Sequence, residues 1–364
     1  MKGIFDPINI SGLGIKNRIV RSATAEMKAD KEGRLTDGYI PVFEDLAKGG
    51  VGVIITGMFG VDGNSGFGPG TPNTYNDSFT QGFRKCSDLV HGYDCRIIVQ
   101  LCHTGAKAMM PDGGAQPLGP SDMALPHAKP ARAMTKEEIK ELTGSFATAA
   151  SRCKEAGADG IQIHAAHGYL ISQFLSPSTN KREDEYGGPI ENRGRILLEI
   201  LGAMREAVGG GFPIWVKING KDLVEESITP EECAWLCLEL EKHGLDAIEL
   251  SAGMGYDRNS SPSKRIVEES DEGSFAPEAL ALADKSGIPV ISTGGFRTPE
   301  VIERWLNQGN IAAIGMSRPL ICEPGLVNRW KEGRIEKARC VSCSKCYRPK
   351  AGYGCQVFSD EPRP

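Results

Sequence analysis

The residues best suited to chemistry in this sequence gather in one short segment, HAAHGYL. It places His164, His167 and Tyr169 within six residues, and all three side chains can donate a hydrogen bond to one small ligand. The spacing is not that of a metal site, because there is no HExxH motif and no carboxylate between the two histidines. One histidine alone is often structural, but two histidines and a tyrosine together favour a binding or catalytic site.

Two glycine-containing segments further along are typical of a phosphate site. STGGFR (292–297) and GMSRP (315–319) supply glycines, whose backbone amides can approach a ligand closely, and an arginine that can pair with an anion. The TGG sequence alone is equally consistent with a tight turn. Arg318, directly after an apolar run, favours the phosphate site.

Four of the eleven cysteines crowd the C-terminal end of the sequence. Cys340, Cys343, Cys346 and Cys355 are spaced C-x2-C-x2-C-x8-C. Four thiolates this close could hold a tetrahedral zinc ion. Reduced or disulfide-bonded cysteines in a loose tail are the alternative. The other seven are scattered singly, as expected of buried thiols in a reducing compartment.

The apolar pattern predicts the frame that carries these residues. Short β-branched runs alternate with amphipathic stretches, as in βα units around a parallel sheet. The runs expected to be strands are residues 17–23, 52–57, 95–101, 159–165, 213–219, 246–252, 288–295 and 311–317. Eight strands, each followed by a helix, favour a single (β/α)8 TIM barrel of the α/β class. Its working residues should follow the C-terminal ends of the strands.

Helix starts agree with this alternation. Thr135 with Glu138, and Thr229 with Glu232, each place an N-cap oxygen and an N3 carboxylate where both can bond to unpaired amides. Thr298 is expected to open a helix in the same way.

Other features narrow the architecture. An open doubly wound sheet would alternate similarly, but no GxGxxG follows the first strand, and the glycine-rich stretch 63–70 is expected in a loop. The segment FDPINISGLGIKNR predicts a small hairpin that caps the barrel floor. We therefore expect a barrel domain over residues 1–335 and a cysteine-rich tail over residues 336–364.

Composition excludes several classes of protein. The 364 residues are 40% apolar and 24% charged, which is typical of a globular chain. A net charge of −5 without long charged runs gives no reason to expect nucleic acid or a membrane surface as a partner. The N-terminal MKGIFDPINI lacks the unbroken apolar run of a secretory signal, and no stretch is apolar enough to span a membrane. We expect a cytoplasmic protein.

The chain resembles the old yellow enzyme family of FMN-dependent ene-reductases (NADH:flavin oxidoreductases) over nearly its whole length. The matching segments are FDPINI, NRIVRSAT, IIVQLCHTG, HAAHGYLISQFLSPSTNKREDEYGG, ENRGR, STGGF and GMSRPL. The resemblance implies an FMN enzyme that takes hydride from NAD(P)H. It would then reduce the C=C bond of a small α,β-unsaturated carbonyl compound, by a ping-pong mechanism in one shared pocket.

The resemblance also implies a set of cofactor contacts. The residues expected to contact FMN are Ser22, Ala23, Thr24, Ala25, Gln100, Lys217, Gly294, Gly295, Ser317 and Arg318. Gln100 would bond the pyrimidine edge of the flavin, and Lys217 would stabilise the negative charge of the reduced flavin. Arg318 would bind the phosphate together with the amides of Gly294, Gly295 and Ser317.

The same resemblance implies catalytic roles for the two histidines and the tyrosine of the HAAHGYL segment. His164 and His167 would donate to the carbonyl oxygen of the substrate and so make its β-carbon electrophilic. Tyr169 would protonate the α-carbon, because a phenol is neutral at working pH and can act as a general acid.

The sequence departs from the family pattern in three places. Many members carry Thr or Cys at the position of Ala25, where alanine cannot tune the flavin potential. Lys217 replaces the arginine of other branches and lacks its planar fork. The cysteine spacing is shorter than in the larger branch resembling 2,4-dienoyl-CoA reductase and trimethylamine dehydrogenase, in which four cysteines bind an iron–sulfur cluster. We expect no second flavin domain after the cysteines.

Two alternatives of other classes stay open. One is an electron-transfer subunit in which flavin and a cysteine-bound cluster pass electrons to a protein partner. The other is a flavin-free, aldolase-like barrel with Lys217 as the Schiff-base lysine. A homo-oligomer is expected on the resemblance alone.

Overall fold

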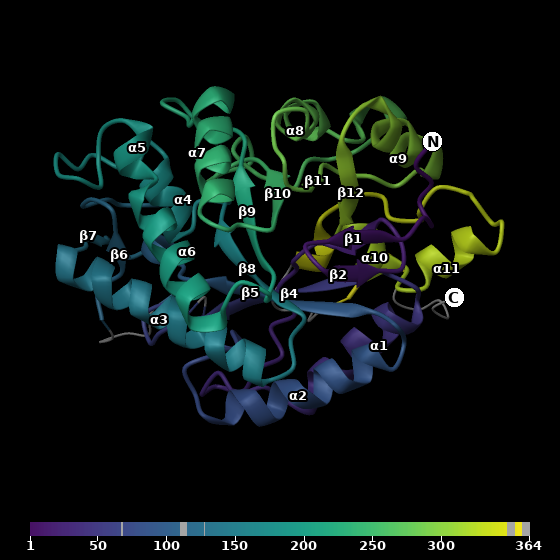
Figure 1. The fold of residues 1–364 in the computed structure, drawn as a ribbon, viewed down its shortest axis with the longest axis horizontal. Coiled ribbons are helices and arrows are strands. Elements are labelled where there is room, and N and C mark those ends of the chain that lie inside the picture. Colours follow the sequence, from purple (N-terminus) through teal and green to yellow (C-terminus); the bar gives the residue numbers. More distant parts are fainter. Residues whose placement is uncertain (67, 110–114, 127, 348–353, 359–364) are drawn as a thin grey trace.

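Eight parallel strands close into a barrel at the centre of the molecule (Figure 1). The computed structural model describes residues 1–364 except 67, 110–114, 127, 348–353 and 359–364. The barrel strands are β3 (Ile19–Arg21), β4 (Val53–Gly60), β5 (Arg96–Cys102), β8 (Gly160–Ala165), β9 (Ile214–Asn219), β10 (Ala247–Ser251), β11 (Val290–Ser292) and β12 (Ile311–Met316). Each predicted run overlaps one of these strands, so the expected (β/α)8 barrel is confirmed.

The strands are buried along almost their whole length, which explains their nearly continuous apolar sequences. The strand expected at residues 288–295 is shorter than predicted and ends at Ser292. Gly294 and Gly295 have φ angles of 128° and 85°. Extended backbone requires negative φ, so the strand cannot continue through these glycines.

Helices surround the barrel (Figure 1). They are α1 (Ile40–Lys48), α2 (Ser78–His91), α3 (Lys136–Glu155), α4 (Leu170–Leu175), α5 (Ile190–Arg193), α6 (Arg195–Val208), α7 (Pro230–Lys242), α8 (Ala276–Ala283), α9 (Pro299–Gln308), α10 (Arg318–Cys322) and α11 (Leu326–Lys331). Two short strands, β6 (Leu118–Gly119) and β7 (Arg132–Ala133), pair outside the barrel. No described helix is both long and apolar enough to cross a bilayer.

Two of the three expected helix starts have the predicted geometry. Thr135 and Glu138 form a capping box at α3, and Thr229 and Glu232 form another at α7. Thr298 does precede α9, but its hydroxyl makes no cap and instead donates to Glu272 Oε1 at 2.8 Å. The prediction for Thr298 was wrong in this respect, because its side chain turns to donate to a nearby buried carboxylate and its oxygen accepts from no amide of the first helical turn.

The predicted hairpin closes the floor of the barrel. Strands β1 (Ile8–Ile10) and β2 (Leu13–Ile15) pair in antiparallel fashion. The buried side chains of Ile10 and Ile15 join the apolar cluster inside the barrel that includes Trp215. The hairpin therefore seals the end of the barrel opposite the C-terminal ends of the strands.

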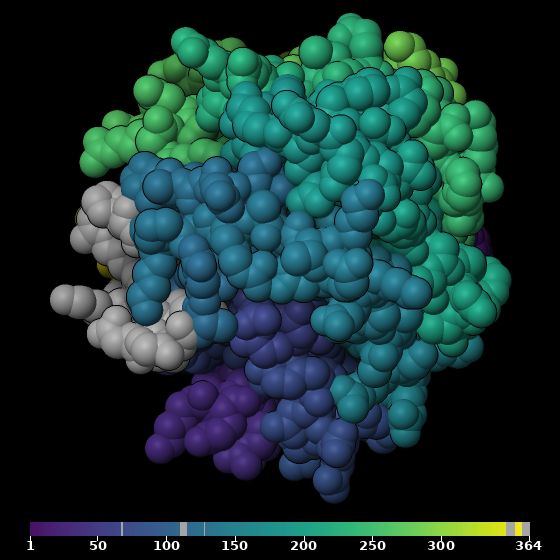
Figure 2. Space-filling view, turned by 90° about the vertical axis from the view of Figure 1, so that its left-hand side faces the viewer, coloured from purple at the N-terminus to yellow at the C-terminus, as the bar shows by residue number. Residues whose placement is uncertain are grey.

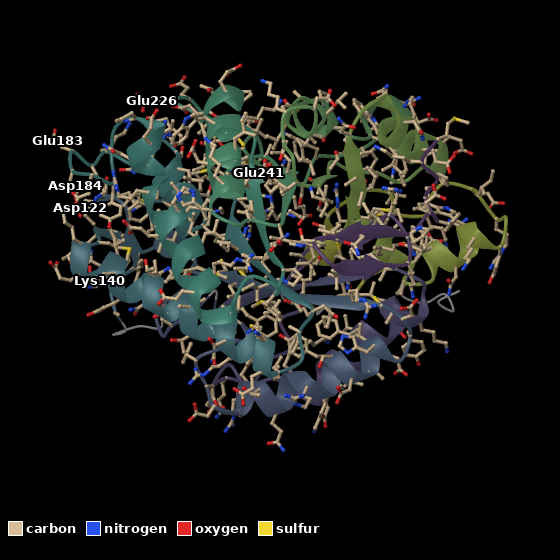
Figure 3. The ribbon with its side chains drawn as sticks, viewed as in Figure 1. Asp122, Lys140, Glu183, Asp184, Glu226 and Glu241 are labelled. Atoms are coloured by element: carbon tan, nitrogen blue, oxygen red, sulfur yellow. The ribbon has the colours of Figure 1, made fainter. Side chains whose placement is uncertain are left out.

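Many charged residues lie on the outer surface. Figure 3 shows Lys140 on α3 and Glu183, Asp184 and Glu226 on loops at the periphery, away from the barrel. Figure 2 views the side whose centre is formed by the blue and teal segments between β5 and α7, with purple N-terminal residues at its lower edge.

The described part of the C-terminal tail lies against the barrel. The N–H of Ala338 donates to Arg297 O at 2.8 Å, and the N–H of Arg339 donates to Glu323 Oε2 at 2.5 Å. The guanidinium of Arg297 donates to Cys340 O at 3.1 Å. The tail therefore packs against the segments that follow β11 and β12.

Candidate active site

A cavity of about 740 Å³ opens at the C-terminal ends of the barrel strands, which is a normal size for a cofactor or substrate site. The predicted site residues that line it are Ser22, Ala23, Thr24, Ala25, Gln100, His164, His167, Tyr169, Lys217, Gly294, Gly295, Ser317 and Arg318. The structure thus brings together all thirteen residues that the sequence predicted for cofactor or catalysis.

The two histidines and Tyr169 form one compact cluster. The ring centroid of His164 lies 5.3 Å from that of His167 and 4.9 Å from that of Tyr169, with edge-to-face geometry. His167 has a φ of 61°, an uncommon value for a residue other than glycine. This turn directly after β8 lets both imidazoles line the same cavity.

Both imidazoles are neutral at ordinary pH. Burial, together with the charges of Lys217 and Lys107, holds the pKa of His164 and of His167 well below the usual range. His167 Nε2 lies 2.8 Å from Ser251 Oγ, and His164 Nδ1 is buried without a partner among the described residues. Each ring therefore has its other nitrogen available to donate a hydrogen bond to a ligand.

Tyr169 stays protonated over a wide pH range, because burial raises the pKa of its phenol far above the usual value. Lys107 Nζ lies 5.1 Å from the centroid of its ring and donates to the backbone oxygens of His167 at 2.7 Å and Met254 at 2.5 Å. Burial lowers the pKa of Lys107 to about 8. Lys107, which sequence reasoning missed, ties the loop after β8 to the loop after β10. Its place shortly after the third barrel strand was the available signal.

Lys217 lies in a buried ion pair. Its Nζ is 3.0 Å from Glu249 Oε1 and donates to Ser22 Oγ at 2.7 Å, and neither charged side chain is more than 5% exposed. Both contacts engage the nitrogen that a Schiff-base lysine would need free to attack a carbonyl group. The pairing therefore counts against the aldolase alternative. Sequence reasoning missed Glu249, because its strand DAIELSA looked like ordinary core.

The opposite side of the cavity has the features of a phosphate site. Within the described residues, the N–H groups of Gly294 and Gly295 donate to no other group. A Cβ atom on Gly295 would lie 2.4 Å from the Ile266 side chain, so only glycine fits there. Arg318 lines the cavity beside them. Two free amides and a guanidinium match the acceptor oxygens of a phosphate.

The tail holds the side chain of Arg318 in place. The guanidinium of Arg318 donates to Ser342 O at 3.2 Å and Ser344 Oγ at 3.1 Å, both in the tail, and to Lys264 O at 2.7 Å. Cys346 of the tail also lines the cavity. The cysteine-rich segment is thus part of the cavity wall rather than a detached appendage.

The chemistry of these groups fits FMN. The cavity offers an anion cradle on one side, and the cation of Lys217 with the amide of Gln100 on another. Ala25 presents only a methyl group, as expected, and a second missed carboxylate, Glu26, lies beside it in an ion pair with Arg21 at 2.7 Å.

The four tail cysteines do not have the arrangement of a metal site in this structure. No group of three or more His, Cys, Asp or Glu side chains that could hold a metal ion is found within the described residues, which include Cys340, Cys343, Cys346 and Cys355. The four thiols do not form such a group in this structure, and their role as ligands stays a prediction.

Comparisons with known proteins agree with this geometry. The chain matches the model of the NADH:flavin oxidoreductase / NADH oxidase family over residues 3–337. It is 35% identical to a metal reductase of Desulforamulus reducens, over 95% of this chain and 51% of that protein. A solved 2-naphthoyl-CoA reductase complexed with 2-naphthoyl-CoA has a TM-score of 0.86 at 30% identity, over 93% of this chain and 54% of that one.

An old yellow enzyme homologue from Zymomonas mobilis has a TM-score of 0.79 at 26% identity, over 92% of this chain and 94% of that one. The chain thus spans about half the length of the metal reductase and nearly all of the Zymomonas protein. Because the family model covers the whole barrel and the fold is that of old yellow enzyme homologues, this chain belongs to the NADH:flavin oxidoreductase family of old yellow enzyme type.

Proposed function

We propose that this chain binds FMN and uses NAD(P)H to reduce the C=C bond of an α,β-unsaturated carbonyl compound. Support comes from the family of the chain and from the convergence of His164, His167 and Tyr169 on one cavity. That convergence is the single observation that carries the proposal, because it combines two neutral donors with one protonated acid.

The two histidines bind and polarise the substrate. A neutral imidazole N–H from each ring donates to the carbonyl oxygen and withdraws electron density from the β-carbon. Each ring is neutral and therefore needs no counter-ion of its own. Its N–H can still stabilise the negative charge that develops on the oxygen. Ser251 holds the ring of His167 through Nε2 and so leaves Nδ1 for the substrate.

Tyr169 supplies the proton. Its phenol keeps its hydrogen at neutral pH and transfers it to the α-carbon. The ammonium of Lys107, over the ring of Tyr169, stabilises the phenolate that remains.

The other end of the cavity would hold FMN. The amides of Gly294 and Gly295 with Arg318 would bind its phosphate, and Gln100 and Lys217 would contact its ring. Bound FMN would supply the hydride carrier, reduced by NAD(P)H and then oxidised by the unsaturated compound. Both reactants would use one cavity in turn, which makes the mechanism ping-pong.

Stopped-flow spectroscopy tests this proposal in two stages. NADH or NADPH should bleach the flavin absorbance of the purified protein. A panel of enones and enoyl thioesters, mixed afterwards, should restore it. A protein that binds no flavin, or a bleached protein that no unsaturated carbonyl compound reoxidises, would contradict the proposal.

We also propose, from the sequence spacing alone, that Cys340, Cys343, Cys346 and Cys355 are metal ligands. Iron, sulfide and zinc analysis of anaerobically purified protein tests this directly. A stoichiometric cluster with negligible enone turnover would favour the electron-transfer alternative instead.

A further inference from the structure

Two buried residues beside the cavity, Gln162 and Glu249, have no role in the function proposed above. Both side chains are fully buried, and neither lines the cavity. Strand pairing places Gln100 beside Gln162 and Lys217 beside Glu249. These four polar residues lie inside the barrel, and only Gln100 and Lys217 reach the cavity.

A continuous chain of hydrogen bonds joins these groups. Glu249 Oε1 accepts from Lys217 Nζ at 3.0 Å and from Ser22 Oγ at 2.5 Å. Glu249 Oε2 accepts from Gln162 Nε2 at 2.8 Å, and Gln162 Oε1 accepts from Gln100 Nε2 at 2.7 Å. The chain of contacts thus begins at a buried carboxylate and ends at a residue on the cavity wall.

The chemistry of Glu249 sets the direction of every bond in this chain. Both carboxylate oxygens of Glu249 accept hydrogen bonds, whereas a glutamine amide donates from one end and accepts at the other. Gln162 must therefore turn its nitrogen to Glu249 and its oxygen to Gln100. Gln100 must in turn direct its nitrogen inward.

The outcome is an acceptor at the cavity wall. Gln100 Oε1 accepts no hydrogen bond from the residues that the structure describes. It is also not among their side-chain atoms that are fully buried without a hydrogen-bond partner. Since Gln100 lines the cavity, this oxygen is available to a ligand.

We infer that Glu249 is a positioning residue that acts through Gln162 to hold Gln100 with its carbonyl oxygen toward the cavity, so that Gln100 recognises an N–H donor on the bound cofactor. The inference rests on the proposed function, because FMN carries such a donor, the N3–H of its pyrimidine ring. An amide turned the other way would present N–H to the ring and could not accept from N3.

The Glu249→Gln variant should reverse the chain of hydrogen bonds. Lys217 and Ser22 need an acceptor and would take the amide oxygen of the new side chain, which leaves its nitrogen facing Gln162. The amide of Gln162 would then turn over, and that of Gln100 after it. Loss of one neutral hydrogen bond should raise the dissociation constant of FMN about fivefold.

The readout is the N3–H group itself. Apoprotein is reconstituted with FMN labelled with ¹⁵N at N3, and the N3 resonance is followed alongside FMN affinity measured by fluorescence quenching. In Glu249→Gln the N3 resonance should move away from its wild-type position. A purely structural role for Glu249 would not shift this one resonance.

Two further variants separate the effect of the relay, the hydrogen bonds that join Glu249, Gln162 and Gln100, from the effect of the charge of Lys217. Gln162→Met interrupts the relay but keeps the ion pair of Lys217 with Glu249, so it should also displace the N3 resonance. In a Gln100→Met background, which lacks the acceptor, adding Gln162→Met should cause no further change in N3 or in affinity.

Glu278→Gln is the matched control. Glu278 pairs with Lys221, and neither residue lines the cavity. The substitution removes a lysine–glutamate pair without touching the relay, and it should leave the N3 resonance and FMN affinity unchanged.

The outcomes distinguish this inference from the proposed function. If FMN binds but the N3 resonance and the affinity are the same in wild type, Glu249→Gln and Gln162→Met, the relay is wrong and the proposed function stands. If the wild-type apoprotein binds no FMN, both are wrong.

Discussion

The protonation states in the site come from burial rather than from unusual residue types. Desolvation keeps His164 and His167 neutral and Tyr169 protonated. Two histidines and a tyrosine, whose ordinary pKa values lie far apart, thus become neutral donors over the same pH range. That common state suits them to binding an oxygen and delivering one proton.

Replacing Tyr169 by phenylalanine should separate the two half-reactions. The variant keeps the ring beneath Lys107 but lacks the acidic O–H, so reoxidation by an enone should slow by roughly 10²–10⁴-fold, the usual worth of a general acid. Bleaching by NAD(P)H should keep its rate, since it needs no proton from this phenol. Stopped-flow absorbance of the flavin measures both steps.

Tyr256→Phe is the control for this change. Tyr256 also lies under Lys107, at 4.9 Å, and its buried hydroxyl has no partner among the described residues. Removing that hydroxyl should leave both rates within a factor of a few. Equal slowing of both half-reactions by Tyr169→Phe would remove Tyr169 from its role as acid.

At the scale of elements, the sequence predicted what depends on local pattern. All eight barrel strands and the hairpin over the floor follow from apolar periodicity and turn residues. The missed features depend on contacts between distant segments. Thr298 bonds to Glu272 instead of capping α9, and Glu249 pairs with Lys217 across the register of β9 and β10. No local spacing reveals such pairs, and a glutamate inside an apolar run looks like core.

The N-terminal hairpin should contribute to stability without affecting catalysis. Ile10 is fully buried in the floor of the barrel, at the end away from the cavity. Ile10→Ala should lower the free energy of unfolding by about 2–5 kcal/mol, because it leaves a cavity in a packed core. Urea unfolding measures this loss, and FMN content and bleaching rate should match the wild type.

Ile335→Ala makes the same chemical change at a side chain that is 54% exposed. It should change the free energy of unfolding by no more than about 0.5 kcal/mol. If Ile10→Ala were as stable as Ile335→Ala, the hairpin would not be a packed part of the barrel.

For the whole molecule, the buried neutral histidines make stability depend on pH. Their pKa values lie well below 6.5 in the folded protein, whereas in the unfolded chain they return to about that value. Above pH 6.5 both states are neutral and the full stability is present. As pH falls below 6.5, the unfolded chain binds protons that the folded protein refuses, so stability is lost.

A His164→Asn/His167→Asn double variant should reduce this loss. Each histidine contributes up to about 1.4 kcal/mol per pH unit to the slope of the free energy of unfolding below pH 6.5. The urea midpoint of wild type should therefore fall more steeply between about pH 6 and pH 5 than that of the variant. Contributions from other groups cancel in the comparison. His243→Asn, at an exposed ring outside the cavity, is the control for the chemical change itself. Equal slopes in wild type and the double variant would mean that the two rings are charged in the folded protein, and neutral imidazole donors could then not be part of the mechanism.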